Sequence, residues 1–159
     1  MFLIGFTIDE YTSLGLNTIT LSRELNKSSL NEILSNSNVN VELTVYGNLP
    51  IMATNYCFLG KTNKCNPMCG TNCKKEQNYY LKDRLGYEFR LLSDSIQTVT
   101  LVFNSKTLSY STEDIPINHV RVDILDESID EINRIINSVY ERKKLEGKIY
   151  TNGNLNREV

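Results

Sequence analysis

All four cysteines of the chain lie in one short segment, and this clustering is the strongest chemical signal in the sequence. Seven, three and three residues separate them in the order Cys57, Cys65, Cys69 and Cys73. Asparagine, proline, glycine and threonine occupy most positions between the last three, so the chain can turn there and bring the thiolates to one centre. The spacing therefore predicts a metal or iron–sulfur site with these four cysteines as ligands.

The type of centre stays open at this point. A structural zinc site with four thiolates usually has two close ligand pairs, whereas here three ligands are bunched and the fourth lies upstream. Tetrahedral zinc and a cubane iron–sulfur cluster both accept four thiolates. We disfavour two disulfides, because the first residues carry no secretory signal pattern and the chain is long enough to build a core without covalent cross-links.

A second group of candidate residues follows two predicted strands, over residues 18–22 and 41–45. Ligands of parallel α/β folds meet the C-terminal ends of the strands. The candidates at these ends are Ser22, Arg23, Glu24, Tyr46 and Gly47. Among them Glu24 is the predicted general acid or base, with Arg23 beside it as the second candidate catalytic residue. A surface or capping carboxylate before the next helix is the alternative for Glu24.

Two other polar groups are weaker candidates. Asp83 and Arg84 stand in a predicted turn, where an ion pair is favoured over a catalytic pair. His119 is the only histidine of the chain. It begins an alternating strand far from the cysteines in sequence, so we disfavour the Ser–His or Cys–His nucleophilic catalysis that would have to use it.

The elements that must position these residues alternate between strand and helix in the first half. Apolar residues 2–8 predict a buried strand, a polar segment with a short helix follows, and the strand over residues 18–22 comes next. A capping box at Ser29 and Glu32 predicts the start of a helix before the second candidate strand. The apolar residues that support this helix and strand are Leu30, Ile33, Leu34, Val41, Leu43 and Val45. Such a β-α-β-α-β series predicts parallel strands.

The second half is predicted to be β-rich, with one helix. Residues 78–92 give two extended runs around a turn at Gly86, and an apolar run over residues 98–103 and an alternating strand over residues 119–125 follow. Ser128 and Glu131 form a capping box for the last helix. Its predicted apolar stripe is Ile129, Ile132, Ile136 and Val139, with Arg142, Lys143 and Lys144 in its last turn and Gly147 as its stop signal.

The length and net charge of the chain favour a single globular domain and give no support for a nucleic-acid-binding protein. The 159 residues suit one ordinary domain, and the net charge of -2 gives no global electrostatic reason to bind nucleic acid. The sequence has no apolar run long enough to span a membrane and no signal peptide pattern, so we expect a cytoplasmic protein without a membrane partner.

Several stretches, taken in order, resemble peptidase family U32, the collagenase-like peptidases. The most specific are residues 46–52 with Cys57, and residues 81–86. Weaker matches cover residues 18–26, 102–110, 119–128 and 147–159. The resemblance implies a β/α barrel with an iron–sulfur cluster on the cysteines, most simply [4Fe–4S], and zinc stays the alternative. Members are named as proteases, and relatives act in hydroxylation of tRNA, ribosomal RNA or a quinone precursor.

The sequence departs from the family pattern in two ways. It begins where the second half of the barrel would begin. Some branches also place a cysteine where Pro50 stands and another near residues 93–97, and both are absent here. The expected fold is therefore α/β, the C-terminal half of a β/α (TIM-like) barrel followed by a small β-rich attachment and a C-terminal helix. The expected parts are a partial barrel (1–56), a cysteine loop (57–78), the attachment with its helix (79–147) and a loosely ordered polar tail (148–159).

Two functions follow from these expectations. The first is an enzyme part, either a protease or an RNA-hydroxylation-type enzyme, whose partners are an RNA or peptide substrate and a separate N-terminal barrel half. The isolated chain is then expected to be inactive. The second is a non-enzymatic, metal-stabilised module in which lysines around the cysteines contact RNA or a protein.

Overall fold

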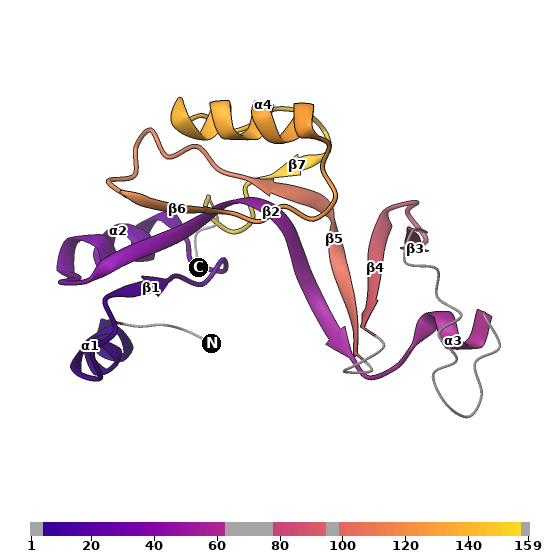
Figure 1. The fold of residues 1–159 in the computed structure, drawn as a ribbon, viewed down its shortest axis with the longest axis horizontal. Helices are drawn as coiled ribbons and strands as arrows, with labels where there is room; N and C mark the ends of the chain where they lie inside the picture. Colours follow the sequence, from indigo (N-terminus) through magenta and orange to yellow (C-terminus); the bar gives the residue numbers. More distant parts are fainter. Residues whose placement is uncertain (1–4, 63–77, 95–98, 157–159) are drawn as a thin grey trace. The chain divides into compact units, whose positions relative to one another are not determined.

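The computed structural model describes residues 5–62, 78–94 and 99–156 (Figure 1). Cys65, Cys69 and Cys73 lie outside these residues. The backbone contacts divide the chain into two compact units. The first unit comprises residues 1–47 and 107–159, and the second comprises residues 48–106.

The fold is mixed α/β, as the sequence predicts at this level. Seven strands of the described part form one sheet in the order β1-β2-β5-β4-β3, with β6 paired to β2 and β7 paired to β5. The strands are β1 (Thr18–Thr20), β2 (Asn40–Thr54), β3 (Tyr79–Lys82), β4 (Glu88–Asp94), β5 (Val99–Ser109), β6 (His119–Val122) and β7 (Tyr150–Thr151). The helices are α1 (Gly5–Ser13), α2 (Lys27–Asn36), α3 (Phe58–Thr62) and α4 (Ile129–Tyr140).

Three strands of the first unit run parallel, which confirms the prediction of parallel pairing. β1 pairs with β2 from Thr18 opposite Asn40, and β6 pairs with β2 from His119 opposite Glu42. Helix α2 makes the crossover from β1 to β2, because parallel neighbours cannot be joined by a tight turn. β1 and β6 end opposite Glu42 and Tyr46 of β2. The predicted end of the second strand at residue 45 is wrong, because β2 continues to Thr54.

Helix α2 is confirmed, but its predicted cap is wrong. The side chain of Asn26 accepts the N–H of Ser29 at 2.9 Å, so the helix begins at Lys27 and Ser29 already lies in its first turn. Asparagine is among the best N-cap residues, since its short carbonyl reaches a free amide of the first turn. Leu30 and Ile33 are buried, as predicted.

The first predicted strand is wrong for the residues that the structure describes. Residues 5–13 form helix α1 instead, with Ile8 buried and Asp9 and Glu10 exposed. The hydroxyl of Thr12 donates to the carbonyl of Ile8 at 2.7 Å, one helical turn back. One buried residue per turn suits a helix, whereas a buried strand would need an apolar residue at every position.

Helix α4 has the predicted capping box at Ser128 and Glu131, but its buried face is rotated from the predicted one. Ile135, which the predicted stripe leaves out, is 1 % exposed, whereas Ile129 and Ile136 are 78 % and 37 % exposed. Positions 132, 135 and 139 lie within one face because the helix repeats every 3.6 residues. Ile132 and Val139 of the predicted stripe are half-buried beside Ile135, whereas Ile129 and Ile136 are exposed, so the stripe is only partly right.

The end of α4 also differs from the prediction. The helix stops at Tyr140, and Arg142 has a left-handed backbone with φ of 61°. The guanidinium of Arg142 donates to the carbonyls of Ile115 and Ile117 at 2.9 and 3.2 Å. The three basic residues therefore follow the helix instead of occupying its last turn, since the bonds of Arg142 support a local bend that ends the helix before Gly147.

Residues 150–155 are ordered, so the prediction of a loose tail is wrong there. Tyr150 and Thr151 form β7 beside β5, and Leu155 is buried. The carbonyl of Leu155 accepts the N–H of Lys27 at 2.9 Å. Arg134 of α4 donates to the Tyr150 hydroxyl at 3.0 Å, and Figure 1 shows these two elements side by side. These contacts offset the entropy of an otherwise polar segment.

The second unit contains the predicted turn at Gly86. Strands β3 and β4 pair antiparallel, with Lys82 opposite Glu88, and β4 pairs antiparallel with β5. The carboxylate of Asp83 accepts the N–H groups of Leu85 and Tyr87 at 2.8 and 2.9 Å, an arrangement that closes the turn. The Asp83 carboxylate therefore binds backbone N–H groups, and the predicted ion pair with Arg84 is replaced by these bonds. The core of this unit is Leu59, Leu91 and Val102, with Cys57, Phe58, Tyr79, Leu81 and Phe89 packed on it.

None of the helices in the described residues is long and apolar enough to cross a membrane.

Candidate functional site

Residues from three segments meet where the strands β1 and β6 end beside the middle of β2, at Tyr46 and Gly47. We call this group the strand-end cluster. It consists of Arg23, Tyr46, Gly47, Arg121, Asp123 and Glu127, and all of them belong to the first unit. The C-terminal ends of strands are where ligands bind in parallel α/β folds.

Asp123 joins two arginines. Its Oδ2 accepts a charged hydrogen bond from Nη2 of Arg23, which lies 100 residues away in sequence, and its Oδ1 accepts one from Nε of Arg121 at 2.6 Å. The side chains of Arg23 and Asp123 are 28 % and 26 % exposed, so their ion pair is partly shielded from water. The two guanidinium groups share one carboxylate, while Glu127 adds a second negative charge to the cluster and Glu42 acts on Arg121.

Gly47 is required by the close approach of Asp123. Its φ is 145°, in the range that favours glycine, and a Cβ at this position would lie 2.7 Å from the Cβ and 2.9 Å from the carbonyl oxygen of Asp123. The N–H of Asp123 donates to the carbonyl of Tyr46 at 2.9 Å. The Tyr46–Gly47 pair therefore holds the backbone of Asp123 against β2.

Tyr46 fixes the loop that follows β6. Its buried hydroxyl donates to Oε1 of Glu127 at 3.0 Å, and Oε2 of Glu127 accepts the N–H groups of Leu125 and Asp126 at 2.7 and 3.1 Å. Burial, followed by the negative charge of Glu127, raises the pKa of Tyr46 above its ordinary value. The phenol therefore stays a neutral donor at physiological pH.

Tyr110 lies beside this cluster and is the least expected member of the site. Its N–H donates to the carbonyl of Val45 at 2.8 Å, and its side chain is 4 % exposed. Within the described residues its hydroxyl has no hydrogen-bond partner. Burial raises the pKa of Tyr110 to about 12, and the positive charge of Arg23 acts in the opposite direction.

The predicted residues at the strand ends have different outcomes. Arg23, Tyr46 and Gly47 belong to the cluster, but Glu24 is exposed, and its backbone N–H donates to the Ser22 hydroxyl at 3.3 Å. Its acid–base role stays a prediction. Our sequence reasoning missed Asp123 and Glu127, although the strand-end rule, applied to the strand that begins at His119, would have found Asp123. No local pattern marks Tyr110.

Cys57 is the only predicted ligand among the described residues. It lies between β2 and α3, it is half-buried, and its thiol is free of any disulfide. The N–H of Gly60 donates to its Sγ at 3.2 Å, and this kind of bond stabilises a thiolate ligand. The described residues contain no group of three or more potential metal ligands. The predicted convergence of the four sulfurs lies outside them.

A comparison with models of known protein families gives one match that covers most of the chain. The model of peptidase family U32 matches residues 6–151, a range that includes the strand-end cluster and all four cysteines. The chain belongs to peptidase family U32. No curated protein and no solved structure matches it.

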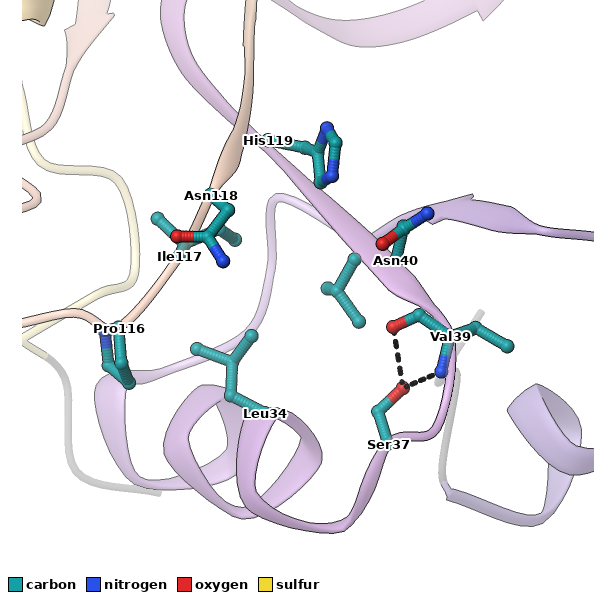
Figure 2. Close-up of a pocket in the computed structure, with 9 residues that line it drawn as sticks. Leu34, Ser37, Val39, Asn40, Pro116, Ile117, Asn118 and His119 are labelled. Carbon is teal, nitrogen blue, oxygen red and sulfur yellow. Dashed lines mark hydrogen bonds between the residues drawn. The ribbon is translucent and has the colours of Figure 1, made fainter.

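For a member of peptidase family U32, the surroundings of the only histidine are of particular interest. His119 lines a pocket of about 150 Å³ together with Ser37, Asn40, Asn118 and apolar side chains (Figure 2). The Ser37 hydroxyl donates to the carbonyl of Val39 and accepts its N–H, both at 3.3 Å. His119 begins β6, whereas Asp123 follows its end. The imidazole therefore lies away from the strand-end cluster, and the nearby serine is bonded to its own backbone.

Proposed function

We propose that this chain is the cluster-binding part of a peptidase family U32 enzyme that hydroxylates RNA or a related substrate, and that it is not a protease. Four thiolates, from Cys57, Cys65, Cys69 and Cys73, would hold a [4Fe–4S] cluster. When bound, such a cluster supplies one-electron redox chemistry. The observation that carries the proposal is the free thiol of Cys57 with an amide donor on its sulfur.

The surroundings of Cys57 fit a ligand of either centre. Its side chain packs on the core formed by Leu59, Leu91 and Val102, which fixes its position at the start of the cysteine segment. A metal-bound thiolate is best stabilised by backbone N–H groups, and Gly60 provides one. The same features would suit a structural zinc ion, so zinc remains the alternative centre.

The surroundings of His119 argue against a serine or cysteine peptidase mechanism. Such mechanisms need a nucleophile within hydrogen-bond distance of a general base. Ser37 lines the same pocket as His119, but its hydroxyl donates to the Val39 carbonyl. This observation favours the hydroxylation-type function over the proteolytic one that the family name suggests.

The parallel strands support a further part of the proposal, namely that the first unit is part of a β/α barrel. β1, α2 and β2 form a parallel β-α-β unit of the kind that barrels repeat, and β6 pairs parallel with β2 although α3, β3, β4 and β5 come between them in sequence. In the described residues β1 pairs with β2 alone, so its other edge is available for a neighbouring strand. We propose that an N-terminal barrel half pairs there and that the isolated chain is inactive.

Purification without oxygen tests the centre directly. We expect visible charge-transfer absorbance, with iron and acid-labile sulfide in equal amounts, and loss of both in Cys57→Ser and Cys69→Ser. Thr71→Ala, a change between two of the cysteines, is the matched control and should keep the cluster. A colourless protein with one zinc ion per chain would favour the non-enzymatic, metal-stabilised module that binds RNA or a protein.

Activity assays test the reaction class. Peptide hydrolysis and RNA hydroxylation would be measured with the isolated chain, and again after an N-terminal barrel half is supplied as a separate chain. We expect RNA hydroxylation only in the second case. Peptide hydrolysis that survives Cys57→Ser would contradict the proposed reaction, and turnover by the isolated monomer would contradict the need for a second half.

A further inference from the structure

The strand-end cluster contains more hydrogen-bond donors than acceptors. Among the described residues Asp123 is the one carboxylate that accepts hydrogen bonds from the two guanidinium groups, from Nη2 of Arg23 and Nε of Arg121, while Glu42 acts on Arg121 through its charge. A guanidinium has five N–H donors in a planar fork, so both arginines keep further donors. Arg121 is 51 % exposed and Arg23 is 28 % exposed, so a ligand can reach these donors from solvent.

The position of the arginines is fixed before any ligand arrives. The shared carboxylate holds both of them at the C-terminal ends of β1 and β6, and Gly47 lets the Asp123 backbone lie directly against β2. Arginines that are already oriented lose little conformational entropy on binding. The charges of the whole cluster balance, so the feature that suits an anion is the set of unused guanidinium N–H donors, which form strong charge-assisted hydrogen bonds to oxyanions.

Tyr110 lies next to this region, since its N–H donates to the carbonyl of Val45. Its hydroxyl is buried and has no partner among the described residues, although buried polar groups are nearly always hydrogen-bonded. The hydroxyl faces Gly153, because a Cβ at that glycine would lie 2.9 Å from its oxygen. It is therefore enclosed by the protein, and the arginines are the donors that a ligand can reach from solvent.

We propose that the strand-end cluster is an oxyanion-binding subsite in which Arg23 and Arg121 hold a carboxylate or phosphate group of the substrate. This inference rests on the proposed enzymatic function, because it assigns a substrate group to the C-terminal ends of β1 and β6. It does not depend on the centre that the cysteines hold.

The test is a titration of the full chain with inorganic phosphate and, separately, with acetate. The arginine Nε–Hε signals in NMR spectra report binding at the guanidinium groups. We expect the signals of Arg23 and Arg121 to shift with at least one probe, and Arg121→Gln to weaken binding roughly tenfold or more. Arg84→Gln is the matched control, since Arg84 lies in the exposed turn of the second unit. A response to phosphate alone would identify a phosphate group, and a response to acetate alone a carboxylate.

Tyr110→Phe is a control for the enclosed hydroxyl next to the arginines. Removal of an unpaired buried hydroxyl should raise the melting temperature of the free protein and should leave anion binding unchanged. Arg121 is exposed, so Arg121→Gln is expected to fold even where Arg23 variants do not. Equal affinities in the wild type and Arg121→Gln, or no shift with either anion, would overturn the proposal.

The same samples distinguish this inference from the proposed function. Cys57→Ser should bind the anion as the wild type does while it loses its iron. Anion binding in a protein that never holds a cluster would support the subsite and contradict the proposed centre. A cluster-loaded protein without anion binding would contradict the subsite alone.

Discussion

Each unit contains an aspartate whose carboxylate accepts two hydrogen bonds, but the partners of the two aspartates lie at very different separations in sequence. Asp83 accepts the N–H groups of Leu85 and Tyr87, at most four residues away, and closes the turn of the β3–β4 hairpin. Asp123 accepts from Arg23, 100 residues away, and its backbone rests on Tyr46 and Gly47. The hairpin is thus built from local contacts, whereas the strand-end cluster exists only when distant segments are assembled.

This difference matters for how each region tolerates change. A local turn re-forms from its own residues, so loss of one bond there affects a small part of the protein. In the first unit one side chain or one glycine supports contacts between segments from both ends of the sequence. We therefore expect substitutions in the first unit to have larger effects on stability than comparable substitutions in the hairpin.

The largest effect is expected for the buried face of α4. Ile135→Ala removes a fully buried side chain and should lower the free energy of unfolding by about 2–5 kcal/mol. Ile136→Ala, one position further on and 37 % exposed, is the matched control and should cost much less. Denaturant unfolding of the two variants measures the difference. Similar losses would mean that the buried face is not centred on Ile135.

The second effect concerns two of the glycines with positive φ, one in each unit. Gly47→Ala combines an unfavourable φ with a Cβ 2.7 Å from a side-chain atom of Asp123, so we expect a loss of about 1–3 kcal/mol or more. Gly86→Ala has a φ of 87° but no atom closer than 3.9 Å, so only the backbone conformation is strained and the loss should be about 1 kcal/mol. Thermal unfolding compares them. A larger loss for Gly86→Ala would contradict the comparison between the units.

A smaller effect is expected at the hairpin turn. Asp83→Ala removes the acceptor for two backbone N–H groups at an exposed site, which should cost about 1 kcal/mol, whereas Asp83→Asn keeps a carbonyl acceptor and should cost less. Amide hydrogen exchange at Leu85 and Tyr87 would localise the change. Faster exchange in the strand-end cluster of Asp83→Ala would show that the turn is not independent.

The smallest effect on stability concerns the ionisation of Tyr110. It should be absent at neutral pH and measurable only at alkaline pH. Its folded-state pKa of about 12 lies above the value of about 10 for an unfolded tyrosine. The stabilising contribution of the neutral phenol is therefore complete below about pH 10 and is lost as the pH rises toward 12. Between these pH values the free energy of unfolding should decrease less with rising pH in Tyr110→Phe than in the wild type. Denaturant unfolding at several pH values measures this. Tyr87→Phe in the hairpin is the control, and an equal flattening in that variant would contradict the assignment.

The sequence by itself determined the features that depend on neighbouring residues. The cap of α4 at Ser128 and Glu131, the turn at Gly86 and the alternation along β6 follow from bonds or periodicities within a few residues. The parallel pairing of β1 and β2 also followed, because a helix between two strands favours it. The family could also be identified from the sequence, because short stretches of characteristic residues in a fixed order are enough to recognise it.

Only the tertiary structure decided which of these residues meet. A run of apolar residues fits a strand or a helix equally well until packing buries one face, and the first predicted strand became helix α1 with Ile8 inward. In α4, likewise, the sequence pattern did not show which face is buried. Packing buries Ile135 and leaves Ile136 exposed. The strand-end cluster required contacts over longer distances, because no local pattern links Arg23 to Asp123 or pairs the Tyr110 N–H with the carbonyl of Val45. Contacts between distant segments depend on the register and direction of whole strands, and these are fixed only when the sheet has formed.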